Sequence, residues 1–373
     1  MNLDHPIHIE TEFEALEQYI AKKKPSQIVV VMDETAEKLC LPLIGHVIPE
    51  DAHPFVLGSE GEDVKRIENA HALWSGFEDV GVDRSSLVIA LGGGSVTDLV
   101  GFAAGTYMRG VACWLVPTTL LAMVDAAIGG KTGINLGGAK NRVGSFSAPV
   151  GVSICGDFMP TLSARAIRSG YAEHQKHYLI SKATELEKTA RWVGPDAGLL
   201  AETVGASAEV KMSIVREDPL EQKARGGRAV LNFGHTAGHA LESWAMGAGE
   251  DLTHGEAVAW GMRVALELSA IVAERAGDAE GSWATQDKIA GALREEAAHL
   301  AVAIPCPASL VDGAEAVSDA DLTSLWTTME RDKKSRGGRV RWVLLEQVGV
   351  ATAGHEVGFK EFRKAVEAVQ LGR

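Results

Sequence analysis

The sequence predicts an α/β domain over residues 1–162, followed by a mostly α-helical domain over residues 163–373. In the first part, short β-branched runs such as 27–32 and 86–91 alternate with helical stretches such as 62–74, which is typical of a parallel sheet flanked by helices. After about residue 161 such runs become rare, and Ala- and Glu-rich helical segments follow. One β-hairpin is expected over residues 339–350, with its turn indicated by Gly337 and Gly338.

The composition is that of an ordinary globular protein. Of 373 residues, 46% are hydrophobic and 23% charged, which suffices for two substantial cores. The net charge of −14 opposes binding to nucleic acid, so an anionic ligand would need a local basic pocket. No apolar run approaches the roughly 20 residues that span a bilayer, and the N-terminus is too acidic for a signal peptide, so we expect a cytoplasmic protein. Four widely spaced cysteines are expected to be buried thiols: Cys40, Cys113, Cys155 and Cys306.

A glycine-rich turn in the first domain indicates a nucleotide site. Residues 91–98 follow a predicted strand and open an apolar helix, so their glycines would let the backbone approach a pyrophosphate at the helix N-terminus. The spacing is not that of the common dinucleotide fingerprint, and a tight strand-to-helix turn also explains the glycines. Thr118 and Thr119 end another predicted strand. Because open α/β sheets bind ligands at the carboxyl ends of their strands, this second polar cluster favours the nucleotide site.

Histidines in the second domain indicate a metal site. His235 and His239 lie four residues apart in an Ala-rich run that is typical of a helix, and His254 follows on a second helical run. Zinc binds imidazole nitrogen and carboxylate oxygen, and a catalytic site keeps one position open. A histidine pair alone is more often part of a core. Glu173, three residues before Lys176 on another predicted helix, supplies the carboxylate that makes the metal site plausible.

A dense polar segment over residues 125–141 is expected to bind an oxygen-rich, phosphorylated substrate. It places Asp125, Lys131, Lys140 and Asn141 on glycine-rich backbone with apolar residues between them, which a solvated loop would not explain. Further candidate cations, each more often a surface charge when taken singly, are Arg109, Lys211, Arg228, Lys333 and Lys334.

Together these motifs resemble the sugar phosphate cyclases and, among them, the 3-dehydroquinate synthase family. The resemblance runs from Gly92 to Lys334 through segments 92–98, 107–110, 116–141, 231–239 and 252–256. It implies a dehydroquinate synthase-like fold, an active site in a cleft between an NAD-binding domain and a metal-binding domain, and a homodimer. The implied reaction converts 3-deoxy-D-arabino-heptulosonate 7-phosphate to 3-dehydroquinate and phosphate, in the shikimate pathway, with catalytic NAD and Zn²⁺ or Co²⁺.

The resemblance also implies roles for individual residues. The implied metal ligands are Glu173, His235 and His254, whereas His239 corresponds to a histidine that supports the ligands or transfers protons and not to a ligand. The implied catalytic residues are Asp125, Lys131, Lys176, Lys211, Arg228, Asn232 and His239. The further implied substrate contacts are Arg109, Asn141 and one of Lys333 or Lys334. The implied NAD contacts are Asp33, Glu62, Lys65, Gly93, Gly94, Asp98, Thr118, Thr119, Lys140 and Thr161.

Departures from the family pattern bear on the exact substrate. His174 and His177 add two imidazoles beside the implied metal ligand, where they could alter pKa values or bind metal themselves. Thr97 replaces the usual glycine of the glycine-rich turn, and Thr35 stands where an Asn is expected. Residues 129–135 argue against the valiolone-forming and deoxy-inosose-forming branches. The amino analogue of dehydroquinate synthase stays open as an alternative.

A different class shares several of these features. Metal-dependent, NAD-linked polyol dehydrogenases have the same two-part layout, a similar glycine-rich turn and a helical histidine pair. Their reaction releases NADH, and it does not need the constellation of Lys131, Asn141, Lys176 and Arg228. This constellation therefore favours the cyclase.

Overall fold

The computed structural model describes residues 3–59, 61–137, 139–190, 197–223, 226–280, 283–306, 318–332 and 340–370. The chain forms two compact units, Met1–Gly170 with Asp196–Leu220, and Tyr171–Pro195 with Glu221–Arg373. The domain boundary expected at residues 162 and 163 stays a prediction. Lys333, Lys334, Gly337 and Gly338 lie outside the described residues.

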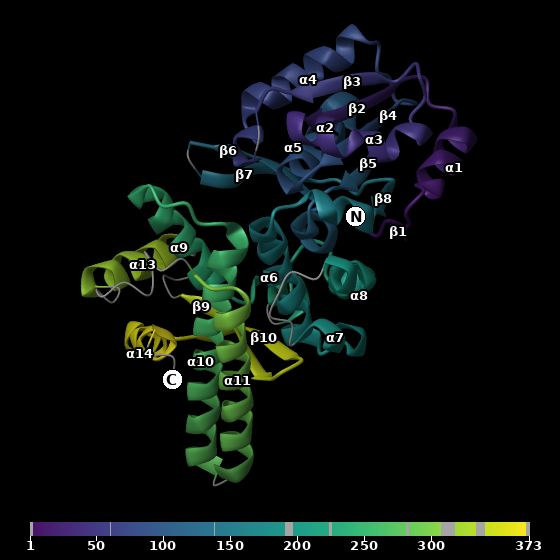
Figure 1. Ribbon diagram of the computed structural model, residues 1–373. Coiled ribbons are helices and arrows are strands. Elements are labelled where there is room, and N and C mark those ends of the chain that lie inside the picture. Colours follow the sequence, from purple (N-terminus) through teal and green to yellow (C-terminus); the bar gives the residue numbers. More distant parts are fainter. Residues whose placement is uncertain are drawn as a thin grey trace. The chain divides into compact units, whose positions relative to one another are not determined.

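The first unit is built on a six-stranded sheet in the order β1-β8-β5-β4-β2-β3, in which the described strands pair in parallel (Figure 1). The interior strands β2 and β4 are almost wholly buried, as expected for continuous apolar runs in a parallel sheet covered on both faces. This confirms the predicted α/β class and the strands predicted near 27–32 and 86–91. The strands are β1 (Ile7–Ile9), β2 (Ile28–Asp33), β3 (His53–Leu57), β4 (Leu87–Gly92), β5 (Ala112–Pro117) and β8 (Gly151–Ile154).

The helices of this unit differ from the prediction at one place. The helix predicted over 62–74 is divided into a short turn, η2 (Gly61–Val64), and helix α4 (Ile67–Asp79), because Arg66 takes an extended backbone with ψ 151°. The other helices are α1 (Glu14–Lys23), α2 (Glu34–Leu39), α3 (Leu41–Ile44), α5 (Gly94–Thr106) and α8 (Ala197–Glu217). Short turns are η1 (Gly45–Val47), η3 (Tyr107–Arg109), η4 (Ala122–Ala126) and η5 (Gly156–Thr161).

The polar segment predicted over 125–141 folds largely into an antiparallel hairpin of β6 (Lys131–Leu136) and β7 (Ala139–Phe146). The hairpin packs closely on α5, since a Cβ atom at Gly101 would lie only 2.7 Å from a methyl carbon of Thr132. This contact holds the hairpin beside the helix that begins at the glycine-rich turn.

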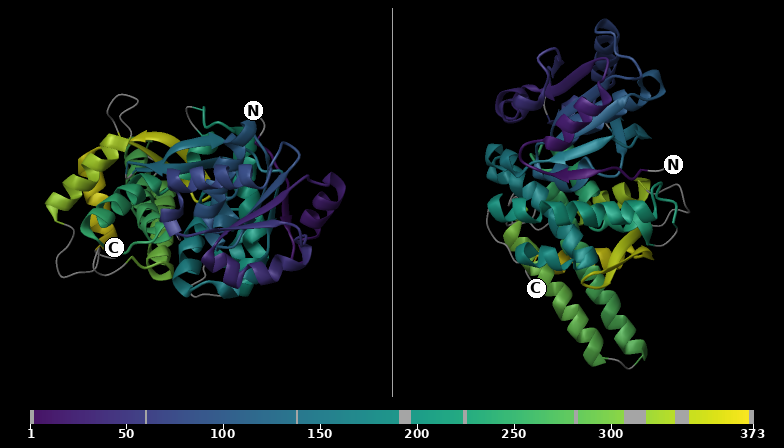
Figure 2. Two further views of the ribbon diagram at one scale, coloured as in Figure 1. Left: turned by 90° about the horizontal axis from the view of Figure 1, so that it is seen from above. Right: turned by 90° about the vertical axis from the view of Figure 1, so that its right-hand side faces the viewer.

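The second unit is mostly helical, as predicted. It contains most of α6 (Ala164–Ser181), then η6 (Thr184–Leu186), α7 (Glu187–Ala190), η7 (Gly227–Asn232), α9 (His235–Ala248), α10 (His254–Glu280), α11 (Trp283–Ala303), α13 (Asp319–Asp332) and α14 (Phe359–Gln370). Helices α10 and α11 lie side by side (Figure 1, Figure 2). Arg294 of α11 joins them through ion pairs with Glu267, at 2.9 Å, and Glu274, at 2.5 Å.

The predicted C-terminal hairpin is present, but its bounds were wrong. It consists of β9 (Arg341–Gln347) and β10 (Val350–Glu356), which pair antiparallel. The turn falls after β9, where Gly349 has a φ of 91°, a value that glycine adopts at little cost. The turn expected at residues 337–338 lies outside the described residues.

Two predictions from composition concern the chain as a whole. Among the described residues, no helix has both the length and the apolar character needed to cross a membrane. All four cysteines are free and buried, which confirms that they are buried thiols.

Candidate metal and nucleotide site

Three potential metal ligands converge in the second unit. Glu173 Oε1 lies 3.4 Å from His235 Nε2 and 3.3 Å from His254 Nε2. The potential ligand atoms of the three residues all lie within 4.8 Å of one another. One carboxylate oxygen and two imidazole nitrogens form a donor set suited to a divalent transition metal, with further positions left for a substrate. The residues present therefore fit a metal ion.

Glycines bring the two histidine-bearing helices together. His235 begins α9 directly after Gly234, whose φ of 80° turns the chain into the helix. A Cβ atom at Gly261 of α10 would lie 2.0 Å from the carbonyl oxygen of Gly234 and 2.7 Å from the amide nitrogen of Gly238. Only glycine at position 261 allows this approach, which places His254, at the start of α10, beside His235.

The start of α10 is fixed by a capping box. The amide of Thr253 donates to Glu256 Oε2 at 2.9 Å, and the amide of Glu256 donates to Thr253 Oγ1 at 3.3 Å. These reciprocal bonds satisfy amide groups that a helix start leaves unpaired. They set His254 in the first turn of the helix.

The electrostatics of the cluster follow from burial and from its carboxylates. Glu173 is fully buried and forms an ion pair with Lys176, which is itself 1% exposed. Burial lowers the pKa of His235, so its ring is neutral and its nitrogen is available as a ligand. Burial also disfavours charge on His254, but its hydrogen bonds with Glu173 and Glu242 outweigh burial and raise its pKa.

His239 and His174 occupy different surroundings. His239 is exposed, and its ring centroid lies 5.1 Å from that of His235 and 6.2 Å from that of His254. The ring of His174 stacks on Tyr171 at 5.9 Å, and burial lowers its pKa to about 4. His177 is fully buried. Whether His174 or His177 affects a metal ion stays a prediction.

Two further predicted residues of this unit lie in η7, the turn that leads into α9. Arg228 is buried, at 3% exposure, and Asn232 donates to Glu221 Oε1 at 3.0 Å. Both residues stand within seven positions of His235 in the sequence.

In the first unit, the predicted nucleotide contacts gather at the carboxyl ends of the parallel strands. Gly92 and Pro117 are partners in the β4–β5 register, and the amide of Thr118 donates to the carbonyl of Gly92 at 2.9 Å. A Cβ atom at Gly93 would lie 3.2 Å from a Thr119 methyl carbon, so glycine lets this turn lie close to Thr119. Gly94 begins α5. The turn therefore offers a helix N-terminus of the kind that binds phosphate groups.

Asp33 and Thr161 also lie at strand or turn ends. Asp33 ends β2, next to β4, and its Oδ1 accepts a bond from the amide of Ala36 at 2.7 Å. Thr161 ends η5, and its hydroxyl donates to the carbonyl of Phe158 at 2.7 Å.

A hydrogen-bonded network links the β6–β7 hairpin to η2 and α5. Buried Lys65 donates to Asp98 Oδ2 at 2.6 Å and also to Asn141. Asn135 donates to Glu62 Oε1 at 2.8 Å, and its own Oδ1 accepts from the amide of Asn141 at 2.9 Å. Burial raises the pKa of Asp98, although the charge of Lys65 opposes the shift. Predicted cofactor and substrate contacts thus share one network.

The remaining predicted residues of this unit are a partly buried pair and three exposed cations. Lys211 of α8 is 3.0 Å from Asp125 Oδ1, and it also donates to the Asp125 carbonyl at 2.6 Å. The exposed cations are Arg109, Lys131 and Lys140.

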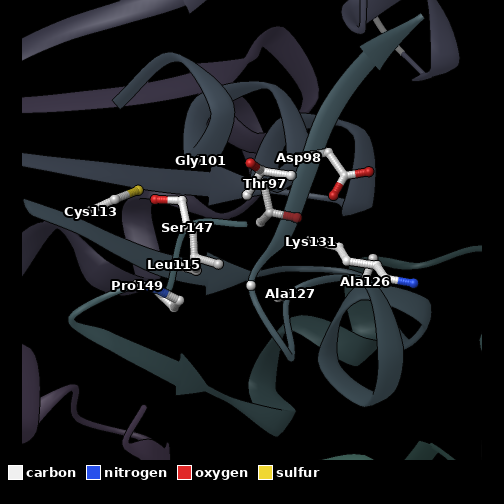
Figure 3. Close-up of a pocket in the computed structure, with 12 residues that line it drawn as sticks. Thr97, Asp98, Gly101, Cys113, Leu115, Ala126, Ala127, Lys131, Ser147 and Pro149 are labelled. Carbon is white, nitrogen blue, oxygen red and sulfur yellow. The ribbon is translucent and has the colours of Figure 1, made fainter. Parts of the chain in front are cut away.

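A small cavity of about 10 Å³ lies between α5 and the hairpin (Figure 3). Asp98 and Lys131 lie on one side of it, and Cys113 and Ser147 on the other. Its volume suits about one water molecule and not a substrate. Thr97 lines this cavity and donates to the Gly94 carbonyl at 3.0 Å, so the unusual threonine is accommodated within the turn of the helix.

Sequence reasoning gave no role to two residues of these networks. Asn135 lies in the polar segment, but two of its three hydrogen bonds are made with Glu62 and Lys65, about seventy residues earlier in the chain. The sequence pattern does not show that these residues lie close together. Glu242 lies seven residues after His235 and three after His239. That spacing places the three side chains on one face of a helix, and it could have identified Glu242.

The parallel α/β unit and the helical unit together form a dehydroquinate synthase-like fold. The chain belongs to the 3-dehydroquinate synthase family, since residues 55–169 match the model for the 3-dehydroquinate synthase N-terminal domain and residues 170–335 match that for the C-terminal domain. The 3-dehydroquinate synthase of Parabacteroides distasonis is 37% identical over 341 residues, which cover 90% of this chain and 88% of that protein.

Two solved structures share the fold. A 2-deoxy-scyllo-inosose synthase complexed with carbaglucose-6-phosphate, NAD⁺ and Co²⁺ has a TM-score of 0.77 at 24% identity, and the match covers 97% of this chain and 95% of that one. The 2-epi-5-epi-valiolone synthase of Streptomyces hygroscopicus, with NAD⁺ and Zn²⁺ bound, has a TM-score of 0.76 at 24% identity, and the match covers 99% and 97%.

Proposed function

We propose that this chain converts 3-deoxy-D-arabino-heptulosonate 7-phosphate to 3-dehydroquinate and phosphate, using NAD catalytically and Zn²⁺ or Co²⁺. Membership of the 3-dehydroquinate synthase family supports this substrate. The observation that carries the proposal is the convergence of Glu173, His235 and His254 at 3.3–3.4 Å, which fits a catalytic metal ion.

The two cofactors would supply what the side chains cannot: when bound, NAD is a reversible hydride acceptor and the metal ion is a Lewis acid. The residues proposed to hold the metal are Glu173, His235 and His254. Gly93 and Gly94 carry no side chains of their own, so the backbone of this turn can approach a pyrophosphate group closely. The other proposed NAD contacts are Asp33, Glu62, Lys65, Asp98, Thr118, Thr119, Lys140 and Thr161.

The reaction as a whole is redox-neutral. Oxidation of a secondary alcohol acidifies the neighbouring carbon–hydrogen bond, phosphate then leaves, the ketone is reduced again, and ring opening precedes an intramolecular aldol closure. The chain must therefore hold one flexible, anionic substrate through several steps, which positioned cations favour. The residues proposed for catalysis and substrate binding are Arg109, Asp125, Lys131, Asn141, Lys176, Lys211, Arg228, Asn232, His239 and one of Lys333 or Lys334.

Among these groups, the buried cations are best suited to bind the anionic groups of the substrate. Lys176, Lys211 and Arg228 are each at most 7% exposed, so their positive charges are weakly screened by solvent and act strongly on a phosphate or carboxylate. Exposed His239 is proposed to exchange protons with solvent and substrate.

A homodimer and a cytoplasmic location are also proposed, on the strength of the family resemblance. Light scattering on the purified protein tests the first, and cell fractionation tests the second.

The substrate is tested by supplying 3-deoxy-D-arabino-heptulosonate 7-phosphate and its amino analogue separately and measuring released phosphate. We expect release with the first compound and a cyclised 3-dehydroquinate product. Release with the amino analogue alone would keep the reaction type but assign the chain to aminodehydroquinate synthesis.

A further inference from the structure

We propose that Glu242 is a positioning residue that orients His254 for metal binding. The inference rests on the proposed metal role of Glu173, His235 and His254, and it adds a fourth side chain that acts through His254 without touching the metal.

The contacts of the His254 ring carry the proposal. An imidazole has two nitrogen atoms, and each nitrogen of His254 faces one carboxylate. Nε2 lies 3.3 Å from Glu173 Oε1, on the side where the ligand atoms converge. Nδ1 lies 3.4 Å from Glu242 Oε1. When a metal ion takes the place of the proton on Nε2, the proton that remains on Nδ1 is held by Glu242, and the Nε2 lone pair is directed at the metal position.

His235 shows the same arrangement with a different partner. Its Nε2 faces Glu173, and its Nδ1 lies 3.2 Å from the carbonyl oxygen of Phe233. Both proposed ligand rings are therefore held through Nδ1. A hydrogen-bond acceptor on the outer nitrogen of a metal-binding histidine fixes the ring and raises its basicity. A carboxylate does this more strongly than a carbonyl, so His254 depends on Glu242 more than His235 depends on Phe233.

The surroundings of Glu242 make it able to hold the ring. It is 9% exposed and lies on α9, on the helix face that carries His235 and His239. The close contact of Gly234 and Gly238 with Gly261 fixes α9 against α10, so the distance between Glu242 and His254 is set by rigid backbone. The side chain of His254 is 28% exposed and would otherwise have room to rotate.

A competing geometry exists, in which Glu242 binds the metal itself. Ligand atoms of His239, Glu242 and His254 also lie within 4.8 Å of one another. The two arrangements differ in what happens to the metal's coordination when Glu242 is replaced. A positioning residue leaves the ligand set intact, whereas loss of a ligand changes it.

The test uses metal-stripped full-length protein and the variants Glu242→Gln and Glu242→Ala. Zn²⁺ affinity is measured by competition with a chromophoric chelator, and coordination is followed by the visible absorption of bound Co²⁺. We expect both variants to bind one metal ion with affinity lowered about 10–100-fold, more for Ala than for Gln, and with the Co²⁺ spectrum of the wild type.

Glu267→Gln is the matched control. Glu267 is also a buried glutamate, at 5% exposure, and it forms an ion pair with Arg294 of α11. It lies on α10, thirteen residues after His254 in the sequence. We expect this variant to lose thermal stability and to keep wild-type metal affinity. An equal loss of affinity in the control would reduce Glu242 to a general structural role and overturn the inference.

Other results overturn it in distinguishable ways. Wild-type affinity in both Glu242 variants shows that Glu242 does not position His254, while the metal site itself stands. A Co²⁺ spectrum that reports a changed coordination number makes Glu242 a ligand. A wild-type protein that binds no stoichiometric metal overturns the proposed function and this inference together.

Discussion

Replacing Gly261 by alanine should disrupt the metal site from a position outside it. The new Cβ atom would lie 2.0 Å from the Gly234 carbonyl oxygen, and real Cβ contacts are not shorter than 3.0 Å, so α9 and α10 must separate by about 1 Å. Metal–ligand distances tolerate only about 0.2 Å. Because His235 and His254 begin these two helices, we expect metal affinity to fall by more than tenfold. Overpacking of this kind also destabilises a core by about 1–3 kcal/mol.

The assay is Zn²⁺ competition with a chelator, together with calorimetric unfolding of the metal-free protein. Gly291→Ala is the control, because a Cβ atom at this exposed position of α11 meets nothing within 4 Å. The control should gain about 0.5–1 kcal/mol from the better helix propensity of alanine and keep its metal affinity. Wild-type affinity and stability in Gly261→Ala would show that the metal site and the two helices do not depend on this contact.

Three further predictions concern ligands and charges. His254→Ala should remove most of the bound zinc and abolish turnover, which elemental analysis and a phosphate-release assay check; stoichiometric zinc in the variant would contradict the ligand assignment. Lys131→Ala and Arg228→Ala should each weaken substrate binding by about 1.5–3 kcal/mol and leave NAD affinity nearly intact in calorimetry, and an equal loss of NAD binding would instead place them in the cofactor site. Hydrogen bonds from Ser26 and Ser85 hold the pKa of Asp83 well below its ordinary value of 3.8, so Asp83 stabilises the fold above that pH and the contribution is lost as pH falls toward the lowered pKa. Asp83→Asn should therefore show a smaller loss of stability between pH 5 and about pH 2 than the wild type in acid-dependent unfolding.

Local patterns predicted much of the fold. The apolar runs at 27–32 and 86–91 became interior strands, because a parallel sheet covered on both faces needs continuous apolar sequence. The helix predicted over 62–74 began later than expected, since the extended backbone of Arg66 interrupts it and hydrophobic periodicity does not report single dihedral angles.

The site was predictable where its residues lie close in sequence. The spacing of His235 and His239 indicated one helix, and α9 carries both. Contacts between residues far apart in the sequence leave no such regular spacing. The pairing of Lys211 with Asp125 joins positions 86 residues apart, and the approach of Gly261 to Gly234 depends on how two helices pack. Such contacts are set by tertiary structure and not by the periodicity of a single segment.

In the proposed reaction, this chain uses NAD as a catalyst within a phosphate-eliminating cyclisation. The most direct test supplies the purified protein with Zn²⁺, with 3-deoxy-D-arabino-heptulosonate 7-phosphate, and with NAD far below the substrate concentration. Released phosphate and NADH absorbance are followed together. We expect one phosphate per substrate consumed, many turnovers per NAD, and no lasting rise in NADH. Accumulation of NADH in proportion to substrate, with phosphate still attached to the product, would contradict the proposed reaction and identify a polyol dehydrogenase instead.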